Sequence, residues 1–540
     1  MGFGRSRKVA AMIVPLTTND FLERAALIYG ERIGIIDEPT QPAPIMGALD
    51  YRTVARLAGN CAANLDALGI GFGERIAIVS QNSARLLIAL YGVTAAGRVL
   101  VPVNFRLSAA EIRYIVEHSG ARLLLIDPEL ADALADIPCE RRAILGPESD
   151  ALLFTARAAT NLHAEIHAEI HAGIHAEIHA WPRDENATAT INYTSGTTAR
   201  PKGVQLTHRN LWINTVTFGL HLGASDRDVY LHTLPTFHCN GWGMPFILAG
   251  MGARQIVLRK VSGAEILRRV AEHGVNMMCG APAVVSAVLD AALDWDGPIP
   301  GRDRVRMVVA GAPPPTRTIE RIETELGWEF IQLYGLTETS PLLTFNRSRA
   351  EWDTLSTHER AQKLGRAGPP GIGVQVRVEA SGEIVARGNV VLDGYWQSPE
   401  ATEAAIKNGW FHTGDGGAMD SDGYISITDR KKDVIITGGE NVSSIEVEDA
   451  LCSHAAVAEV AVIGVPDEKW GETVKALVVL AHGASATERE LIEHCRTLLA
   501  HYKCPTSVEL RSELARTATG KLQKFRLREP YWAGRERKVN

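Results

Sequence analysis

Short apolar runs alternate with longer amphipathic stretches through the first part of the chain. Residues 76–79 and 123–126 have the length and composition of buried strands, whereas residues 51–68 and 84–96 carry apolar positions at helical spacing. The same alternation resumes over residues 229–333. Because strands that alternate with helices build parallel sheets with helices on their faces, the pattern predicts a large α/β domain.

The pattern changes beyond Pro369. Short strand-like pieces, among them residues 374–379 and 424–428, are separated by glycine and aspartate, which predicts a small β-rich subdomain. A charged run follows at residues 429–433, and a compact α+β pattern comes after it. We therefore predict an α/β fold class, with a large N-terminal domain of residues 1–430 and a small α+β C-terminal domain of residues 431–540.

Composition and charge narrow the class of protein. A chain of 540 residues is too long for one compact core, and its 46% hydrophobic and 22% charged residues are ordinary globular usage. The net charge of −7 provides no positive field for nucleic acid. The longest stretch without Asp, Glu, Lys or Arg, residues 229–253, contains histidines, prolines and glycines that a transmembrane helix would not carry. We expect neither nucleic-acid binding nor stable membrane insertion.

The cysteines and the N-terminal residues bear on the compartment. The seven cysteines are scattered and form no C-x-x-C pair, so neither a disulfide framework nor a cysteine-rich zinc site is indicated. The first apolar run is short and lacks a signal-peptide cleavage pattern. We expect a cytoplasmic protein.

Residues 163–180 form a degenerate four-residue repeat, HAEIHAEIHAGIHAEIHA. Histidines four positions apart lie on one face of a helix and can bind Zn²⁺ or Ni²⁺. Local sequence duplication in a tolerant surface loop gives the same pattern, and neither a carboxylate nor a cysteine is uniquely placed beside the histidines. The repeat favours adventitious metal affinity over a metal site that the protein uses.

The run INYTSGTTARPKG at residues 191–203 is rich in hydroxyls and glycine and contains one lysine. Such a turn can surround phosphate oxygens with backbone N–H groups and hydroxyls while the lysine adds a positive charge. The glycine spacing differs from a Walker motif, and no helix pattern follows directly. The run predicts a phosphate-binding loop, with an ordinary Ser/Thr-rich loop as the alternative.

With this loop the chain resembles the adenylate-forming superfamily of acyl-CoA synthetases, firefly luciferases and nonribosomal-peptide adenylation domains. The resemblance continues in order through YGLTET at 334–339, TGD at 413–415, DRKK at 429–432, GGEN at 438–441 and TGK at 519–521. It covers the chain from about Phe21 to the C-terminus. One departure is Ala199, where many relatives have glycine.

The resemblance implies a role for each motif. Attack of a carboxylate on the α-phosphate of ATP brings two anions together, so we expect lysines and Mg²⁺ to neutralise the negative charge. The implied catalytic residues are Lys521, Lys202 and Glu338, and Mg²⁺ is held by Glu338 with Thr194. The implied ATP and AMP contacts are Thr194, Ser195, Gly196, Thr197, Thr198, Lys202, Gly311, Ala312, Pro313, Gln332, Tyr334, Gly335, Thr337, Asp415, Arg430 and Lys521. Among these contacts, the ring of Tyr334 stacks on adenine, and Asp415, assisted by Arg430, accepts hydrogen bonds from the ribose.

Two half-reactions imply two positions of the C-terminal domain. By resemblance, Lys432 is the hinge about which this mobile domain turns. The turn removes Lys521 and brings Gly438, Gly439 and Glu440 to coenzyme A.

The run TFHCNGW at residues 236–242 corresponds to the segment that borders the acyl pocket in the superfamily. The resemblance assigns the acyl-binding roles to His238 and Trp242, with Gly311. These two side chains are four positions apart, so we expect them on one face of the following helix. The alternative is core packing for both. Because the flanking residues 275–289 offer few polar groups, we favour a fatty acid of short to medium length.

The sequence therefore predicts an ATP- and Mg²⁺-dependent carboxylic acid–CoA ligase that acts through an acyl-AMP intermediate. The alternatives are a long-chain fatty-acid–CoA ligase, an acyl-AMP ligase that loads a carrier protein and, from another class, a catalytically silent nucleotide- or metal-binding protein. The expected partners are a small carboxylic acid, ATP and coenzyme A. Relatives are often dimers, so a homodimer is a further expectation.

Overall fold

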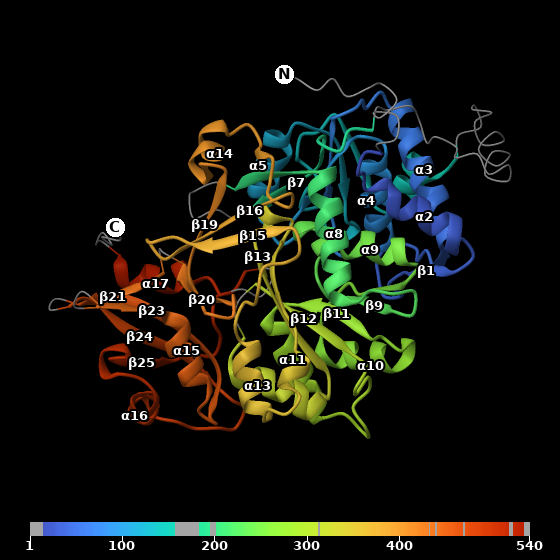
Figure 1. Cartoon of the computed structure of the whole chain (residues 1–540). Coiled ribbons are helices and arrows are strands. Elements are labelled where there is room, and N and C mark those ends of the chain that lie inside the picture. Colours follow the sequence, from blue (N-terminus) through green and yellow to red (C-terminus); the bar gives the residue numbers. More distant parts are fainter. Residues whose placement is uncertain are drawn as a thin grey trace, which may run out of the picture. The chain divides into compact units, whose positions relative to one another are not determined.

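The computed structural model describes residues 14–156, 183–194, 201–311, 314–430, 433–437, 440–467, 470–517 and 522–533 (Figure 1). The chain divides into two compact units. Unit 1 comprises residues 1–260, 337–341 and 389–403, and unit 2 comprises residues 261–336, 342–388 and 404–540. The predicted domain boundary after residue 430 lies inside unit 2 and stays a prediction.

A seven-stranded sheet forms the centre of unit 1, in the order β17-β8-β7-β4-β3-β5-β6. Strands β7, β4, β3, β5 and β6 run parallel to one another, whereas β8 and β17 are antiparallel to their neighbours. Valine, isoleucine and leucine from β3, β4 and β5 pack with α5 into a buried core. The strands are β3 (Arg75–Val79), β4 (Val99–Val103), β5 (Ala121–Ile126), β6 (Arg141–Ile144), β7 (Thr188–Thr194), β8 (Lys202–Thr207) and β17 (Gly394–Tyr395).

Side-chain caps fix where the helices of unit 1 begin. Ser83, Ser108 and Thr207 each accept a hydrogen bond from a backbone N–H of the first turn of α4, α5 and α8. The main helices of unit 1 include those predicted at residues 51–68 and 84–96. They are α2 (Asn19–Tyr29), α3 (Tyr51–Ala67), α4 (Ala84–Ala95), α5 (Ala109–Ser119), α8 (His208–Leu222) and α9 (Met244–Met251). A second group of strands in unit 1 consists of β1 (Ile33–Ile36), β2 (Ala48–Asp50), β9 (Val229–His232) and β10 (Arg254–Val257).

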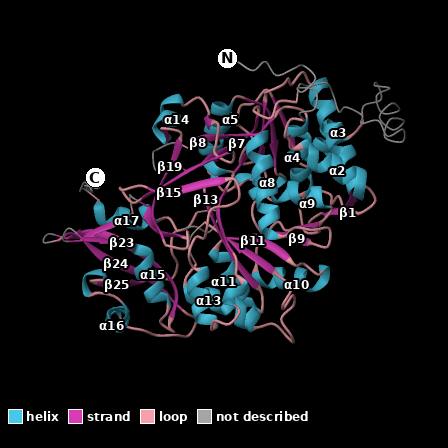
Figure 2. Cartoon of the chain, in the orientation of Figure 1, coloured by secondary structure: helices cyan, strands magenta, loops and turns pink. Residues whose placement is uncertain are grey.

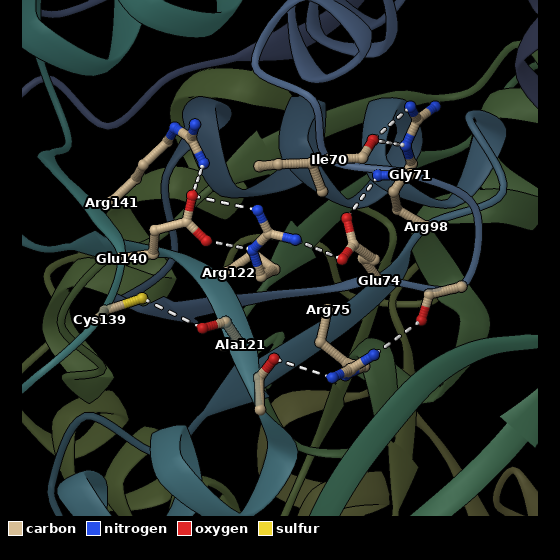
Figure 3. Close-up of polar contacts among 12 residues, drawn as sticks. Ile70, Gly71, Glu74, Arg75, Arg98, Ala121, Arg122, Cys139, Glu140 and Arg141 are labelled. Atoms are coloured by element: carbon tan, nitrogen blue, oxygen red, sulfur yellow. Dashed lines mark hydrogen bonds and ion pairs between the residues drawn. The ribbon is translucent and has the colours of Figure 1, made fainter.

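An ion-pair cluster lies where β3, β5 and β6 begin. Figure 3 shows the guanidinium of Arg122 between the carboxylates of Glu74 and Glu140, with Arg141 on the far side of Glu140. The Gly71 N–H and Arg122 lower the pKa of Glu74, and Arg122 lowers the pKa of Glu140. The cluster joins the ends of three neighbouring strands.

Unit 2 begins with three parallel strands, β11 (Met277–Gly280), β12 (Arg306–Val309) and β13 (Glu329–Gly335), followed by antiparallel β14 (Leu342–Asn346). Its helices here include α10 (Gly263–His273), α11 (Pro282–Leu293) and α13 (Thr357–Leu364). The helix-like residues 315–326 form α12 (Thr316–Arg321) and then a π-helical turn, Ile322–Leu326. The helix widens there because the N–H of Gly327 bonds to the carbonyl of Ile322, five residues back.

The remaining part of unit 2 is β-rich, as the sequence predicts. One antiparallel sheet contains β15 (Val374–Val378), β16 (Glu383–Gly388), β18 (Ile406–Lys407), β19 (Trp410–Met419) and β20 (Ile425–Arg430). A second sheet contains β21 (Ile435–Thr437), β22 (Glu440–Val442), β23 (Val457–Asp467), β24 (Gly471–Leu480) and β25 (Ser507–Leu510). Helices α15 (Ser444–Cys452), α16 (Glu488–Leu498) and α17 (Lys524–Trp532) accompany the second sheet (Figure 2). The predicted α/β class with a β-rich subdomain and a final α+β part is confirmed. Among the described residues, no helix is both long and apolar enough to span a bilayer.

Candidate active site

The predicted phosphate-binding loop connects β7 to β8, which form an antiparallel hairpin in unit 1. Thr194, the last residue of β7, lies directly opposite Lys202, the first residue of β8. The hairpin therefore brings together the first hydroxyl and the lysine of the motif. The intervening Ser195, Gly196, Thr197 and Thr198 lie outside the described residues.

The two-residue strand β17 adds a side chain that the sequence motifs did not predict. Tyr395 pairs with Val204 of β8, and the Nζ of Lys202 lies 5.1 Å from the centre of its ring. The hydroxyl of Tyr395 donates a hydrogen bond to Oε1 of Glu338 at 3.0 Å. Burial and the negative charge of Glu338 raise the pKa of Tyr395, so its hydroxyl stays protonated and donates. The only sequence feature that could have drawn attention to Tyr395 is the aromatic pair that it forms with Trp396 after a glycine.

Backbone hydrogen bonds hold Glu338 in place within unit 1. Glu338 belongs to a short 3-10 turn, Thr337–Thr339, and its carbonyl accepts the N–H of Leu392 at 2.8 Å. Two residues further on, the hydroxyl of Ser340 donates to the carbonyl of Val390 at 2.8 Å. The segment that carries Tyr395 therefore also fixes the turn that carries Glu338.

The donor set fits Mg²⁺. Glu338 supplies a carboxylate and Thr194 a hydroxyl, both hard oxygen ligands. In the described part of the chain, no group of three or more His, Cys, Asp or Glu side chains could hold a metal ion by itself. A single carboxylate suits an ion that arrives with substrate phosphates and keeps part of its hydration shell.

The predicted adenine and ribose residues of unit 2 lie on neighbouring elements. Tyr334 is near the end of β13, and its hydroxyl donates to Oδ2 of Asp415 on β19 at 2.9 Å. Asp415 is buried and pairs in register with Arg430 at the end of β20. The structure thus brings three of the predicted residues to one place, although only the backbone of Arg430 is described.

Two further predicted nucleotide residues have local features that suit the role. Gln332 is 4% exposed, and its Oε1 has no hydrogen-bond partner among the described residues, so it can accept a bond from a ligand. Gly311 is exposed and has a φ of +96°, a conformation that favours glycine over any residue with a Cβ. Gly335 and Thr337 are half-buried, and Ala312 and Pro313 lie outside the described residues.

The acyl segment differs from the expectation. His238 and Trp242 do not share a face of the following helix, because α9 begins only at Met244. Residues 239–243 instead form a left-handed turn, with φ values of 46°, 54°, 59°, 62° and 79°. The glycines at 241 and 243 adopt this conformation at low cost and Asn240 adopts it more readily than most residues, whereas Cys239 and Trp242 each cost about 1–2 kcal/mol.

Buried asparagines offset the cost of this turn. Asn240 is fully buried, donates to Oγ1 of Thr190 at 2.9 Å and exchanges hydrogen bonds with the side-chain amide of Asn192. The side chain of Asn214 donates to the carbonyl of Trp242 at 3.1 Å. Trp242 is 3% exposed and His238 is half-buried. The turn is therefore tied to β7, the strand that leads into the phosphate hairpin.

The predicted hinge, coenzyme A and mobile-lysine motifs are described only in part. Lys432, Gly438, Gly439 and Lys521 lie outside the described residues, as does the histidine repeat. Glu440 is exposed and pairs with Thr437 of β21. Arg516 and Leu522, on either side of the stretch that includes Lys521 in the sequence, form an antiparallel β-bridge.

Comparisons with known proteins agree with these motifs. The family model described as AMP-binding enzyme matches residues 23–396, and the model described as AMP-binding enzyme C-terminal domain matches residues 446–521. The chain is 37% identical to 2-methylpropanoate–CoA ligase CCL4 of Humulus lupulus over 95% of both chains. It is 36% identical to the probable peroxisomal acyl-activating enzyme 5 of Arabidopsis thaliana over 96% of both.

Solved structures are similar over the same length. O-succinylbenzoate CoA synthetase of Bacillus subtilis, in complex with its acyl-adenylate intermediate, aligns with a TM-score of 0.78 at 29% identity, covering 94% of this chain and 97% of that one. The same enzyme in complex with ATP and magnesium aligns with a TM-score of 0.77 at 28% identity, covering 94% and 99%. The chain therefore belongs to the AMP-binding enzyme family, and its relatives within that family include CoA ligases that match almost its whole length.

Proposed function

We propose that this enzyme is an ATP- and Mg²⁺-dependent carboxylic acid–CoA ligase that acts through an acyl-AMP intermediate. The observation that carries the proposal is the grouping of Lys202, Glu338 and Thr194 around the β7–β8 hairpin, a lysine, a carboxylate and a hydroxyl at one phosphate-binding motif. The names of the matched relatives support coenzyme A as the acceptor.

In the first half-reaction, an oxygen of the substrate carboxylate bonds to the α-phosphorus of ATP and the bond to pyrophosphate breaks. Lys202 and the hydroxyls of the hairpin bind the departing phosphates, and Lys521 offsets the charge that gathers on the α-phosphate oxygens. Mg²⁺ bound with ATP supplies further charge neutralisation, and Glu338 with Thr194 would hold it. Asp415, Tyr334 and Arg430 orient the nucleoside.

In the second half-reaction, the thiol of coenzyme A attacks the acyl carbonyl and AMP leaves, so the thiol proton must be lost. We assign Gly438, Gly439 and Glu440 to the path of coenzyme A and Lys432 to the hinge. Glycines suit a narrow passage because a side chain there would obstruct it. The C-terminal domain that moves would begin at residue 431.

We propose a fatty acid of short to medium length as the substrate. The ligase from Humulus lupulus, named for a short branched acid, supports a small acyl group. The buried Trp242 in its left-handed turn supports a pocket closed by a large side chain, with His238 as a neighbour in the same segment. Each of the seven cysteines, all in the described part of the chain, is a thiol, which supports a reducing compartment such as the cytoplasm. A homodimer stays a prediction.

The test is release of AMP in the presence of coenzyme A across acids from acetate to palmitate, with branched acids included, and with the product identified by mass spectrometry. Acyl-CoA formation with a sharp optimum among the short acids is the expected result. Accumulation of acyl-AMP without a thioester would favour a ligase that loads a carrier protein. Absence of acid-dependent exchange between pyrophosphate and ATP for every acid would refute the proposal.

A further inference from the structure

We propose that Tyr395 is a positioning residue that holds Lys202 and Glu338 in place for ATP and its metal ion. The proposal rests on the function proposed above and adds a residue that none of the family motifs quoted for this chain contains. One side chain contacts both charged groups, since the Lys202 ammonium lies 5.1 Å from the ring centre and the hydroxyl donates to Glu338 at 3.0 Å.

The tyrosine is itself held on both sides of its short strand. The N–H of Tyr395 donates to Oγ1 of Thr402 at 2.9 Å, and β17 pairs with β8. The next residue, Trp396, donates from its backbone N–H to the carbonyl of Gly203 at 2.7 Å. Its indole N–H donates to the carbonyl of His118 at 3.1 Å. Tyr395 is thus anchored to the strand that begins with Lys202, and its neighbour is anchored to α5.

The opposite charges of Lys202 and Glu338 explain why a tyrosine suits position 395. An ammonium and a carboxylate on adjoining elements attract each other, and a direct ion pair between Lys202 and Glu338 would compete with phosphate and metal. The aromatic ring offers its negative face to the ammonium, and the hydroxyl offers a proton to the carboxylate. Each charge is then stabilised by a neutral group that ATP and its metal ion can replace or supplement.

The hydroxyl by itself fills only a small part of the acceptor capacity of Glu338. It donates one hydrogen bond to Oε1, and a carboxylate has about four acceptor positions. A phenol has an ordinary pKa of about 10 and is neutral at pH 7, so the hydroxyl donates to the carboxylate and adds no second negative charge. Its part is to orient the carboxylate rather than to accept a proton.

The experiment compares Tyr395→Phe, which keeps the ring, with Tyr395→Leu, which removes both contacts. Tyr51→Phe is the control, because it deletes a more deeply buried tyrosine hydroxyl that donates to the carbonyls of Leu248 and Ala253 in the same unit. The first readout is binding alone: calorimetric titration of ATP with Mg²⁺ and without it, in the absence of any acid, and Mn²⁺ binding by electron paramagnetic resonance. The second is the Mg²⁺ dependence of pyrophosphate exchange.

We expect Tyr395→Phe to need about tenfold more Mg²⁺ in both readouts while binding metal-free ATP as the parent does, because only the carboxylate loses its orienting bond. Tyr395→Leu should also weaken binding of metal-free ATP, since Lys202 is then free to pair with Glu338. Tyr51→Phe should lower thermal stability and leave both metal readouts unchanged.

Parent-like metal dependence in folded Tyr395→Phe and Tyr395→Leu would overturn the inference. An equal change in Tyr51→Phe would also overturn it, because the effect would then follow from any lost buried hydroxyl. If the parent itself supports no exchange with any acid, the proposed function fails, and the binding titrations still decide the role of Tyr395.

Discussion

Replacement of Asn240 by alanine tests whether buried hydrogen bonds maintain the left-handed turn at residues 239–243. Loss of the side-chain amide removes the hydrogen bonds that Asn240 makes with Thr190 and Asn192 in a buried place, which costs about 1–3 kcal/mol, although Thr190 and Asn192 stay bonded to each other. Alanine also adopts the φ of 54° less readily than asparagine, at a further cost of roughly 1–2 kcal/mol. We expect the free energy of unfolding to fall by about 2–5 kcal/mol.

Two further variants separate these contributions. Asn240→Gly deletes the same hydrogen bonds but tolerates the turn, so it should be the more stable of the two by roughly 1–2 kcal/mol. Asn408→Ala is the matched control, since Asn408 is exposed and has a φ of 53°. Its free energy of unfolding should fall only by the cost of placing alanine in the left-handed conformation. Urea unfolding of the full chain, followed by tryptophan fluorescence and circular dichroism, measures each value. Equal stability of Asn240→Ala and Asn240→Gly, or a loss below about 0.5 kcal/mol in both, would refute this account of the turn.

Three other predictions concern catalysis, the repeat and pH. Lys521→Ala should slow adenylation by about 10²-fold and leave thioester formation from supplied acyl-AMP nearly intact, and equal losses in the two half-reactions would contradict the division of roles. Excision of residues 163–180 should leave turnover close to that of the parent, whereas a loss that zinc reverses would make the repeat functional. Burial lowers the pKa of His208 and His232 to about 4. Below about pH 6.5 the unfolded chain therefore binds protons first, and stability should fall between about pH 6.5 and 4, by up to about 3 kcal/mol for each histidine. The urea concentration at half-unfolding, measured at several pH values, tests this dependence of stability on pH. The dependence should be weaker in His208→Gln.

Hydrophobic periodicity was sufficient for most elements of the fold. The apolar runs at β3 and β5 and the helix-like stretches at α3 and α4 appear in the structure within a few residues of their expected bounds. These elements are predictable because burial of one face or of both faces leaves a repeating pattern in the chain. The motifs likewise singled out Thr194 and Lys202, which the structure places opposite each other, and Tyr334 and Asp415, which it joins by a hydrogen bond.

Backbone handedness and long-range contacts leave no comparable pattern. Asn240, Gly241 and Gly243 are compatible with a left-handed turn, and Pro245 suits the start of the helix after it, but no periodic pattern shows that His238 and Trp242 lie outside that helix. Tyr395 contacts Glu338 from 57 positions away along the chain, so no local spacing reveals it. Such features follow from tertiary packing, which single-sequence periodicity does not record.

The division of one motif between the two units has a consequence for cutting or grafting this chain. Tyr334 belongs to unit 2, whereas Glu338, four residues later, belongs to unit 1 through the short excursion 337–341. Tyr395 returns to unit 1 by the second excursion, 389–403. A fragment that ends near residue 260 would keep the phosphate hairpin and lack both the carboxylate and the tyrosine that accompany it. Exchange of nucleotide or metal preference with a relative therefore requires a transplant of at least three separate stretches of sequence.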